Sequence, residues 1–299
     1  MKSIHTLIPD IYELVGGRNA ERNGEGPTIS RELAEQLSGG VADRIYEHFA
    51  QSGPGPKLRM SALGQVCPCS LWYRANKPEL AEALPPWAKI KYAYGHIIEA
   101  LAITLAKAAG HTVEGEQDVV ELDGVKGHRD CIIDGCVVDV KSASSKSFIK
   151  FKDGSIREND NFGYLEQLDG YVVASANDPL VRVKDKGYLL AIDKTLGHMA
   201  LYEHVVREDH IRKRIRDHKS IIALDRPPRC TCEEVPYGAS GNIALGPIAS
   251  YNPFKFSCKP HLRVFLYKER NGFKPVYLTK VVRVPDVTEI DRLGNVIRQ

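Results

Sequence analysis

Apolar and polar residues follow one another along this chain at spacings that predict a succession of helices and strands. A helical repeat covers about residues 28–51, where Ser30 stands at the position expected of an N-cap. A second repeat runs from 87 to about 109, and further helices are predicted at 160–176 and 198–222. Strand-like segments lie at about 112–121, 126–133, 136–142, 187–192, 263–267 and 276–283. This order predicts an α/β fold, with a mixed central β-sheet flanked by helices and an N-terminal helical segment.

Two breaks in the pattern indicate how the chain is organised. Residues 52–56 are rich in glycine and proline, and residues 226–229 contain two prolines. We therefore expect an N-terminal helical segment at 1–56 and a core at 57–225. The remaining residues, 226–299, are expected to form a loop-rich and β extension packed on the core.

The stretch 127–141 carries the strongest local signal. Asp134 and Gly135 separate two apolar runs, and both residue types tolerate the positive φ angles of a two-residue hairpin turn. If they form the loop, counting outward along both strands places Asp130 opposite Asp139. Side chains in such a pair lie about 5 Å apart at Cβ, where two like charges are destabilising. Lys141 falls on the same face of the strand, two residues beyond Asp139.

This arrangement favours a divalent metal site over an ordinary exposed strand. Two carboxylates held together are destabilising unless a cation lies near both. The ordinary alternative is that Asp130 caps a turn and that Asp139 is in contact with water. That alternative does not explain an aspartate set among Val137, Val138 and Val140, opposite another aspartate. We therefore predict that Asp130 and Asp139 bind a metal ion.

Two further segments contain candidate site residues. Glu99 follows Gly95 by four positions, so both lie on one helix face, and the missing side chain of Gly95 would let that face approach a sheet closely. Tyr164, Gln167 and Tyr171 fall on one helical stripe, where the Gln167 amide could order a phosphate or an attacking water. The alternatives are an exposed glutamate on an amphipathic helix and an ordinary half-buried helix face.

Lysines, hydroxyl side chains and phenylalanines are interleaved at 141–152, directly after the proposed site. Lysine and hydroxyl donors suit phosphate oxygens, and aromatic rings can stack on bases or wedge between them. The alternative is a solvated loop. The candidate substrate-binding residues are Ser142, Ser144, Lys146, Lys150, Tyr164 and Tyr171.

Composition adds little to this picture. Of the 299 residues, 43% are hydrophobic and 26% charged, as in ordinary soluble domains. The net charge of +3 is too small to indicate a nucleic-acid partner, so a DNA-binding surface has to be a local patch. The N-terminus lacks the features of a signal peptide, and no apolar run is long enough to cross a bilayer. Seven irregularly spaced cysteines fit a reducing compartment, so we expect a cytoplasmic protein with no membrane partner.

Taken in the order in which they occur along the chain, the candidate residues resemble the motifs of the PD-(D/E)XK nuclease superfamily. The similar branch contains RecB-type nuclease domains, lambda exonuclease and phage-encoded exonucleases. The resemblance covers residues 58–180 well, and it implies a restriction-endonuclease-like core. The matching residues are Gly95 and Glu99 for Gly-x-x-x-Glu, Asp130 for the following Asp, Asp139 and Lys141 for Asp-x-Lys, and Gln167 and Tyr171 for Gln-x-x-x-Tyr.

The resemblance implies a metal-dependent DNA exonuclease in the recombination, repair or degradation of phage or bacterial DNA, acting in the host cytosol. Lys141 would orient the attacking water or stabilise charge on the phosphate. Ligation by oxygen atoms favours Mg²⁺ or Mn²⁺ over zinc. The implied metal ligands are Glu99, Asp130, Asp139 and the carbonyl oxygen of Val140. The implied catalytic residues are Glu99, Asp130, Asp139, Lys141 and Gln167.

Two other functions are compatible with the same residues. The same core serves structure-specific and sequence-specific endonucleases, and a catalytically inactive copy would be a DNA-binding or partner-binding module. Analogy with relatives also suggests two kinds of protein partner: a recombinase or single-strand annealing protein, and further copies of this chain.

The cysteines depart from the family pattern. Some relatives, including CRISPR-associated adaptation nucleases, carry an iron–sulfur site with one cysteine before the core and three near the C-terminus. Here Ala249 and Asn252 stand where a close-spaced cysteine pair is expected. We therefore expect Cys67, Cys230, Cys232 and Cys258 to be ordinary core or surface residues and not ligands of an iron–sulfur cluster or a zinc ion. Cys131 and Cys136 are expected to pack in the core.

Overall fold

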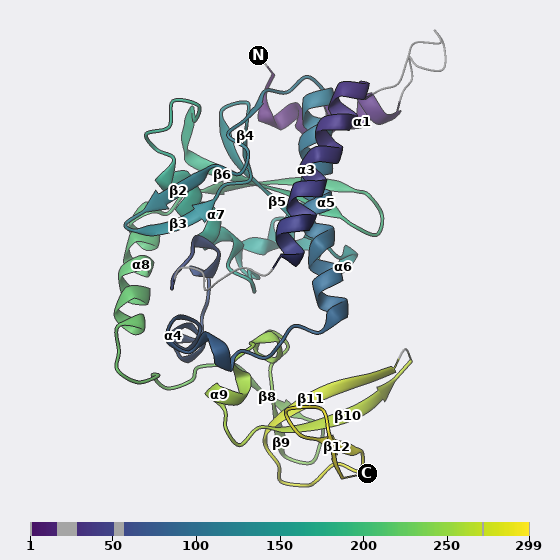
Figure 1. The fold of residues 1–299 in the computed structure, drawn as a ribbon, viewed down its shortest axis with the longest axis vertical. Coiled ribbons are helices and arrows are strands. Elements are labelled where there is room, and N and C mark those ends of the chain that lie inside the picture. The colour runs from purple at the N-terminus through teal and green to yellow at the C-terminus, as the bar shows by residue number, and fades with distance from the viewer. Residues whose placement is uncertain (1, 17–28, 51–56, 271, 299) are drawn as a thin grey trace. The chain divides into compact units, whose positions relative to one another are not determined.

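The structure is a computed structural model that describes residues 2–16, 29–50, 57–270 and 272–298 (Figure 1). The chain forms two compact units, one of residues 1–64 and 84–215 and the other of residues 65–83 and 216–299. These boundaries differ from the expected divisions at 57 and 226, because 65–83 packs with the C-terminal part. The indole N–H of Trp72 donates a hydrogen bond to the carbonyl of Leu224 at 2.7 Å, for example.

A mixed five-stranded sheet forms the centre of the first unit. In spatial order its strands are β1 (Val113–Glu114), β4 (Cys131–Ile133), β5 (Cys136–Ala143), β6 (Val183–Asp193) and β7 (Met199–Val205). The strands β5 and β6 are parallel, and the other neighbouring pairs are antiparallel. A separate two-stranded ladder is formed by β2 (Val119–Leu122) and β3 (Val125–His128).

Helices cover both faces of this sheet. The helices α1 (Leu7–Gly16) and α5 (Pro86–Ala108) share one buried apolar cluster with β5, to which Val138 belongs. The helices α6 (Ser145–Lys152), α7 (Tyr164–Ala174) and the first half of α8 (Glu208–Ile222) share another cluster, to which Val137 belongs. Val137 and Val138 are neighbours on β5, and alternation along the strand sends their side chains to opposite faces. The predicted fold class, a mixed sheet flanked by helices, is confirmed.

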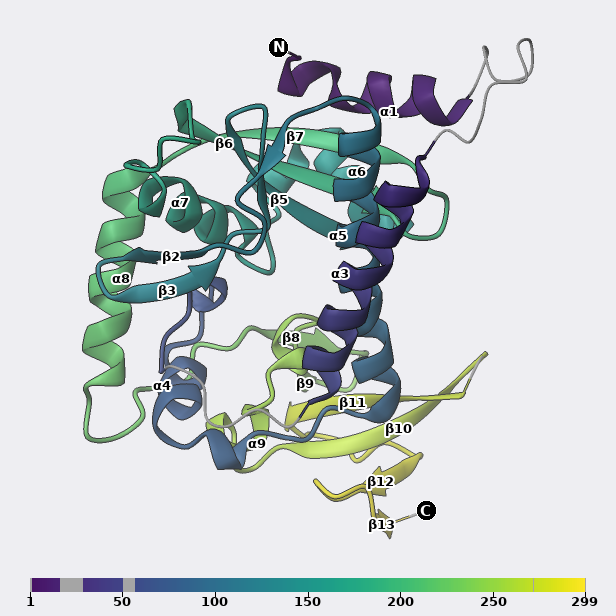
Figure 2. The same cartoon turned by 45° about the horizontal axis from the view of Figure 1, so that its top comes forward.

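The predicted N-terminal helix is also present. It is α3 (Arg31–Phe49), and Ser30 caps it by accepting a hydrogen bond on its side-chain oxygen from the backbone N–H of Leu33 at 3.2 Å. In both views α3 runs alongside α5 (Figure 2). The short helices of this unit are η1 (Ile4–Thr6), η2 (Met60–Ala62) and η4 (Ser155–Arg157). None of the described helices is both long and apolar enough to span a membrane.

The hairpin between β4 and β5 has the predicted register. Ile133 pairs with Cys136, and the two residues between them have φ angles of 51° at Asp134 and 80° at Gly135. Both angles are positive, as a two-residue turn of this kind requires. The carboxylate of Asp134 also accepts a hydrogen bond from the backbone N–H of Thr112 at 3.1 Å, which holds the turn against the chain before β1.

The predicted helix at 198–222 is wrong in its first part. Residues Met199–Val205 form β7, which pairs with β6, and α8 begins only at Glu208. Ala200 and His204 are buried, and their spacing of four fits one face of a helix and one face of a strand equally well. The predicted strands at 112–121 and 126–133 are each interrupted, so that they form four short strands instead of two.

The second unit contains a six-stranded antiparallel sheet around Phe265 and Leu278, which are fully buried. In spatial order its strands are β13 (Val296–Arg298), β12 (Thr288–Ile290), β10 (Arg263–Glu269), β11 (Gly272–Lys280), β9 (Asn242–Leu245) and β8 (Glu234–Tyr237). Its helices are α4 (Pro68–Asn76), η3 (Pro78–Leu80), η5 (Ala249–Tyr251) and α9 (Lys255–Cys258).

Candidate active site

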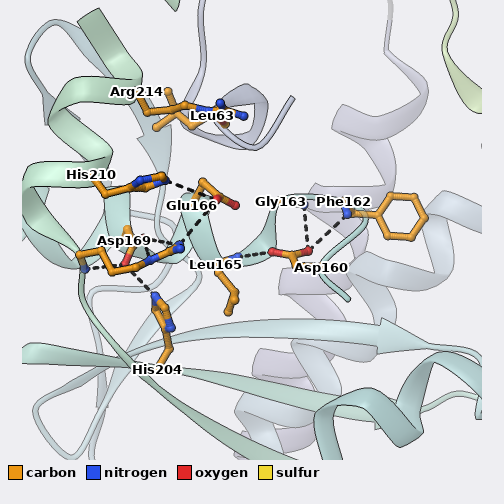
Figure 3. A network of polar contacts seen from close by, with 11 residues as sticks. Leu63, Asp160, Phe162, Gly163, Leu165, Glu166, Asp169, His204, His210 and Arg214 are labelled. Atoms are coloured by element: carbon orange, nitrogen blue, oxygen red, sulfur yellow. Dashed lines mark hydrogen bonds and ion pairs between the residues drawn. The ribbon is translucent and has the colours of Figure 1, made fainter. Parts of the chain in front are cut away.

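Helix α7 is held in place at two points along its length (Figure 3). At its start, the carboxylate of Asp160 accepts hydrogen bonds from the backbone N–H groups of Gly163 at 2.9 Å and Leu165 at 2.8 Å. In its middle, the buried carboxylate of Asp169 lies 2.8 Å from Nε2 of His204 and accepts hydrogen bonds from the guanidinium of Arg207. These contacts tie α7 to β7 and to the chain just before α8.

Two glycines let neighbouring strands approach α7 closely. A Cβ atom on Gly187 of β6 would lie 2.8 Å from the side chain of Leu168, and one on Gly127 of β3 would lie 2.7 Å from the ring of Tyr171. Both distances are shorter than real Cβ contacts, so a larger residue at either position would force the neighbouring side chains to shift. Helix α7 therefore packs closely against β6 and β3.

The two predicted aspartates meet at the start of the β4–β5 hairpin. The Oδ2 atom of Asp130 accepts a hydrogen bond from the backbone N–H of Val140 at 2.8 Å. The side chain of Asp139 is 1% exposed and forms an ion pair with Lys141. The Oδ1 atom of Asp139 has no hydrogen-bond partner among the described residues. A buried carboxylate oxygen without a hydrogen-bond partner is destabilising unless a cation binds it.

The pKa values of these groups reflect first their burial and then the charges of their neighbours. Burial, and then the charges of Asp139 and Glu99, raise the pKa of Asp130 well above its usual value. Burial likewise raises the pKa of Asp139 and, against the opposing charge of Arg44, that of Glu99. Burial alone would lower the pKa of Lys141, but the charges of the two aspartates outweigh it and raise that pKa. Lys141 therefore stays protonated beside these carboxyl groups.

The candidate residues of α7 surround Lys141. Its Nζ atom donates a hydrogen bond to Oε1 of Gln167 at 3.3 Å and lies 4.8 Å from the centre of the Tyr164 ring. The Nε2 atom of Gln167 in turn donates to the hydroxyl of Tyr171 at 2.8 Å. The structure thus brings the four predicted residues into one network, and Tyr171 fixes which end of the Gln167 amide is turned to the lysine.

Glu99 extends toward this site from α5, and it is held by two contacts that the sequence does not reveal. Its Oε1 atom lies 3.0 Å from Nη1 of Arg44 on α3 and accepts a hydrogen bond from Nε2 of Gln117 at 2.7 Å. Neither residue belongs to a recognisable motif. The reason expected for the approach of Glu99 is wrong, because a Cβ atom on Gly95 would meet none of the described atoms within 4 Å.

Carboxylate oxygens are the donors that Mg²⁺ and Mn²⁺ prefer, but the three carboxylates are not gathered on one point in the described part of the chain. Among the described residues, only three cysteines have ligand atoms that all lie within 4.8 Å of one another. Glu99 is held by Arg44 and Asp139 by Lys141. Hard oxygen donors, an excess of negative charge and the unpartnered oxygen of Asp139 are the features that a divalent ion would satisfy.

Arg44→Ala is expected to tighten Mn²⁺ binding about fivefold. An ion bound at Glu99 would compete with the guanidinium for the same oxygen, and a contact of about 1 kcal/mol corresponds to roughly that factor. Titration calorimetry on the full chain measures the affinity. Arg31→Ala is the matched control, because Arg31 is an exposed arginine on the same helix. Weaker Mn²⁺ binding by the Arg44 variant would show that Arg44 holds Glu99 in place as a ligand.

The prediction that the phenylalanines of residues 141–152 contact bases is wrong. Residues Ser145–Lys152 form helix α6 and not a solvated loop, and its Phe148 and Phe151 are buried in the core. They cannot stack on bases without leaving it. The sequence pattern is ambiguous here because aromatic residues three apart suit a buried helix face as well as an exposed binding loop.

The remaining substrate-binding candidates are placed in different surroundings. Ser144 caps α6, and the Nζ atom of Lys150 donates to the carbonyl of Asn159 at 3.0 Å. Ser142 is half-buried near the end of β5, and Lys146 is exposed. Tyr164 and Tyr171 lie in the network of Lys141, as described above.

A second cluster of ligand-type side chains lies within the second unit. The Sγ atoms of Cys67, Cys230 and Cys258 lie within 4.8 Å of one another, and Cys69 and Cys232 belong to the same cluster. The sequence predicts ordinary core or surface cysteines, and the structure places these residues in one buried cluster in which three of the sulfur atoms lie close together. It does so because α4, the segment before β8 and α9 meet in one unit.

Cys230 and Cys232 are a close-spaced pair that packs in this cluster. The amide of Asn252 donates to Cys232 at 3.5 Å and to Cys258 at 3.7 Å. Hydrogen bonds from the thiols of Cys232 and Cys258 lower the pKa of Cys67. Convergent sulfur atoms are the donors that zinc and iron–sulfur clusters use. Cys131 and Cys136, by contrast, are buried in the core of the first unit, as predicted.

No protein-family model and no curated protein matches this chain. Among solved structures, the crystal structure of SSO0001 matches 66% of this chain and 90% of its own chain, at 18% sequence identity and a TM-score of 0.39. A likeness of this size carries no argument about fold or function, and both rest on the geometry described above.

Proposed function

We propose that this protein is a divalent-metal-dependent deoxyribonuclease that degrades DNA from its ends. The observation that supports this most is the buried Asp139, whose Oδ1 atom has no partner among the described residues and whose neighbours are Asp130 and Lys141. Cleavage of a phosphodiester needs cations beside the phosphate and a donor for the charge that develops on it. The carboxylates of this group offer a place for the cations, and Lys141 supplies the donor.

Glu99, Asp130, Asp139 and the carbonyl of Val140 would hold Mg²⁺ or Mn²⁺, which when bound offsets phosphate charge and acidifies bound water. The chain's own residues position the phosphate and the attacking water. The protonated Lys141 donates hydrogen bonds to the phosphate or to the attacking water. Gln167 keeps the ammonium group of Lys141 in position, and Tyr171 keeps Gln167 in position.

Digestion of linear DNA but not of covalently closed circular DNA is the expected behaviour of the purified protein. Each DNA is incubated with Mg²⁺, Mn²⁺ or EDTA and run on a gel. The preference for ends rests on the resemblance to exonucleases. Cutting of the circle would instead support a structure-specific or sequence-specific endonuclease. Tight binding without cleavage of either DNA would contradict a nuclease and support a binding module.

We also propose that the cysteine cluster of the second unit binds a soft metal group, either a zinc ion or an iron–sulfur cluster. Protein purified without oxygen should contain zinc or iron, and Cys258→Ser should lose most of it, because Cys258 contributes one of the three convergent sulfur atoms. Elemental analysis and visible absorbance distinguish the two groups. Cys136→Ala, which removes a thiol from the other unit, should leave the metal content unchanged. Metal-free wild-type protein would contradict the proposal.

A further inference from the structure

A cavity of about 550 Å³ lies beside α5 in the first unit. It is lined by Lys91, Tyr94, Ile97, Ile98 and Lys194. Lys194 directly follows β6, and its backbone N–H donates a hydrogen bond to the carbonyl of Ala143 at 3.0 Å. The cavity therefore adjoins the end of β5, the strand that carries Asp139 and Lys141.

One wall of this cavity is apolar and includes an aromatic ring that is open to solvent. Tyr94 is 49% exposed and Ile97 is 40% exposed, although both lie on a helix whose opposite face is buried. Trp87 and Ile90 continue the same exposed stripe toward the start of α5, at helical spacing. An exposed ring flanked by aliphatic side chains is a surface on which an unpaired base can stack.

The lining of the cavity also includes two lysines. Neither Lys91 nor Lys194 forms an ion pair within the described part of the chain. Both lysines line the same cavity, and burial, followed by the charge of Lys91, lowers the pKa of Lys194. Two adjacent cations with no carboxylate between them indicate a place for an anion, and phosphate is the anion that lysines of this kind bind.

We infer that this cavity binds one unpaired nucleotide of a DNA strand, with its phosphate at Lys91 and Lys194 and its base against Tyr94. The inference rests on the proposed function, since it assigns the substrate a single-stranded segment beside the cleavage site. Ala143, which accepts the hydrogen bond from Lys194, lies two residues beyond Lys141 on β5, a rise of about 7 Å along the strand.

Fluorescence anisotropy with a labelled single-stranded oligonucleotide tests this on the full chain, in EDTA so that no cleavage occurs. Replacing both lysines by alanine should weaken binding about tenfold or more and reduce the salt slope by about 0.7 per lysine. Tyr94→Ala should weaken binding about tenfold, and Tyr94→Phe should restore it because the stacking face is kept. Binding of a blunt duplex of the same length should change less. Lys184→Ala, an exposed lysine of β6, is the control.

Unchanged single-strand binding and an unchanged salt slope in the double-lysine variant would overturn the inference. An equal loss for single strands and duplex would do the same, because it would indicate a general electrostatic surface. The outcome is separate from that of the proposed function. Cleavage by wild-type protein with normal binding by the variants removes only the inference about the cavity. If the variants lose binding but wild-type protein does not cleave DNA, the assignment of the cavity stands and the proposed nuclease activity is disproved.

Discussion

Asp139→Asn and Lys141→Ala are each expected to reduce the rate of DNA cleavage about a thousandfold while the protein stays folded. Asp139 offers the buried oxygen that lacks a partner, and Lys141 supplies the donor for charge on the phosphate. The loss of one such preorganised group from an active site costs about two to three orders of magnitude in rate. Gel assays of linear DNA with Mn²⁺ measure the rate, and thermal unfolding followed by circular dichroism confirms the fold.

The two variants should differ in a second measurement. Asp139→Asn should lose most of its affinity for Mn²⁺, because it removes a ligand, whereas Lys141→Ala should bind Mn²⁺ at least as tightly as wild-type protein because it removes a competing cation. Asp185→Asn and Lys184→Ala are matched controls, since both residues are exposed on β6. Substantial cleavage by both purified site variants would disprove the assigned roles.

Asp169→Ala is expected to lower the free energy of unfolding by about 3 kcal/mol, the largest effect on stability that we predict. Asp169 is fully buried and lies between His204 and Arg207, which link α7 to β7 and to the chain before α8 (Figure 3). Removal of one member of a buried ionic group leaves the others without compensation and costs about 3–5 kcal/mol. Because Arg207 is 40% exposed, we place the effect at the lower end.

This effect should depend on pH. Burial alone would raise the pKa of Asp169, but the hydrogen bond from His204 and the charges of His204 and Arg207 outweigh it and lower that pKa below the usual 3.8. A depressed folded-state pKa contributes stability above the unfolded-state value, and this contribution is lost as the pH falls through the folded-state value. The difference between wild-type and variant should therefore be constant from about pH 7 to about pH 5 and shrink below about pH 4.

Urea unfolding at several pH values measures this difference. Glu208→Ala is the control, because Glu208 belongs to an exposed ion pair with Arg212 that should contribute less than about 1 kcal/mol. Similar stability losses in the two variants would show that the Asp169 group is not the anchor of α7. If it is the anchor, Asp169→Ala should also slow cleavage, since α7 carries Gln167.

The sequence predicts the part of the site that depends on local geometry. The register of the β4–β5 hairpin follows from a two-residue turn, so the placement of Asp130 and Asp139 needs no knowledge of the rest of the fold. The stripe of α7 follows in the same way from helical spacing. In each case the residues are close in sequence, and regular backbone geometry alone brings their side chains together.

The parts that the sequence does not predict depend on contacts between distant segments. Arg44 approaches Glu99 only because α3 packs beside α5, and no spacing within α3 marks that arginine. Cys67 meets Cys230 and Cys258 only because α4 belongs to the second unit. The strand β7 is missed for a different reason, since its short apolar pattern also fits a helix.

The most direct test of the central claim is the digestion of an end-labelled linear DNA by one wild-type preparation, first with Mn²⁺ and then with excess EDTA. The account predicts loss of full-length DNA that stops as soon as EDTA is added. Persistence of intact DNA with both Mn²⁺ and Mg²⁺, in a preparation that is folded and binds Mn²⁺, would contradict it.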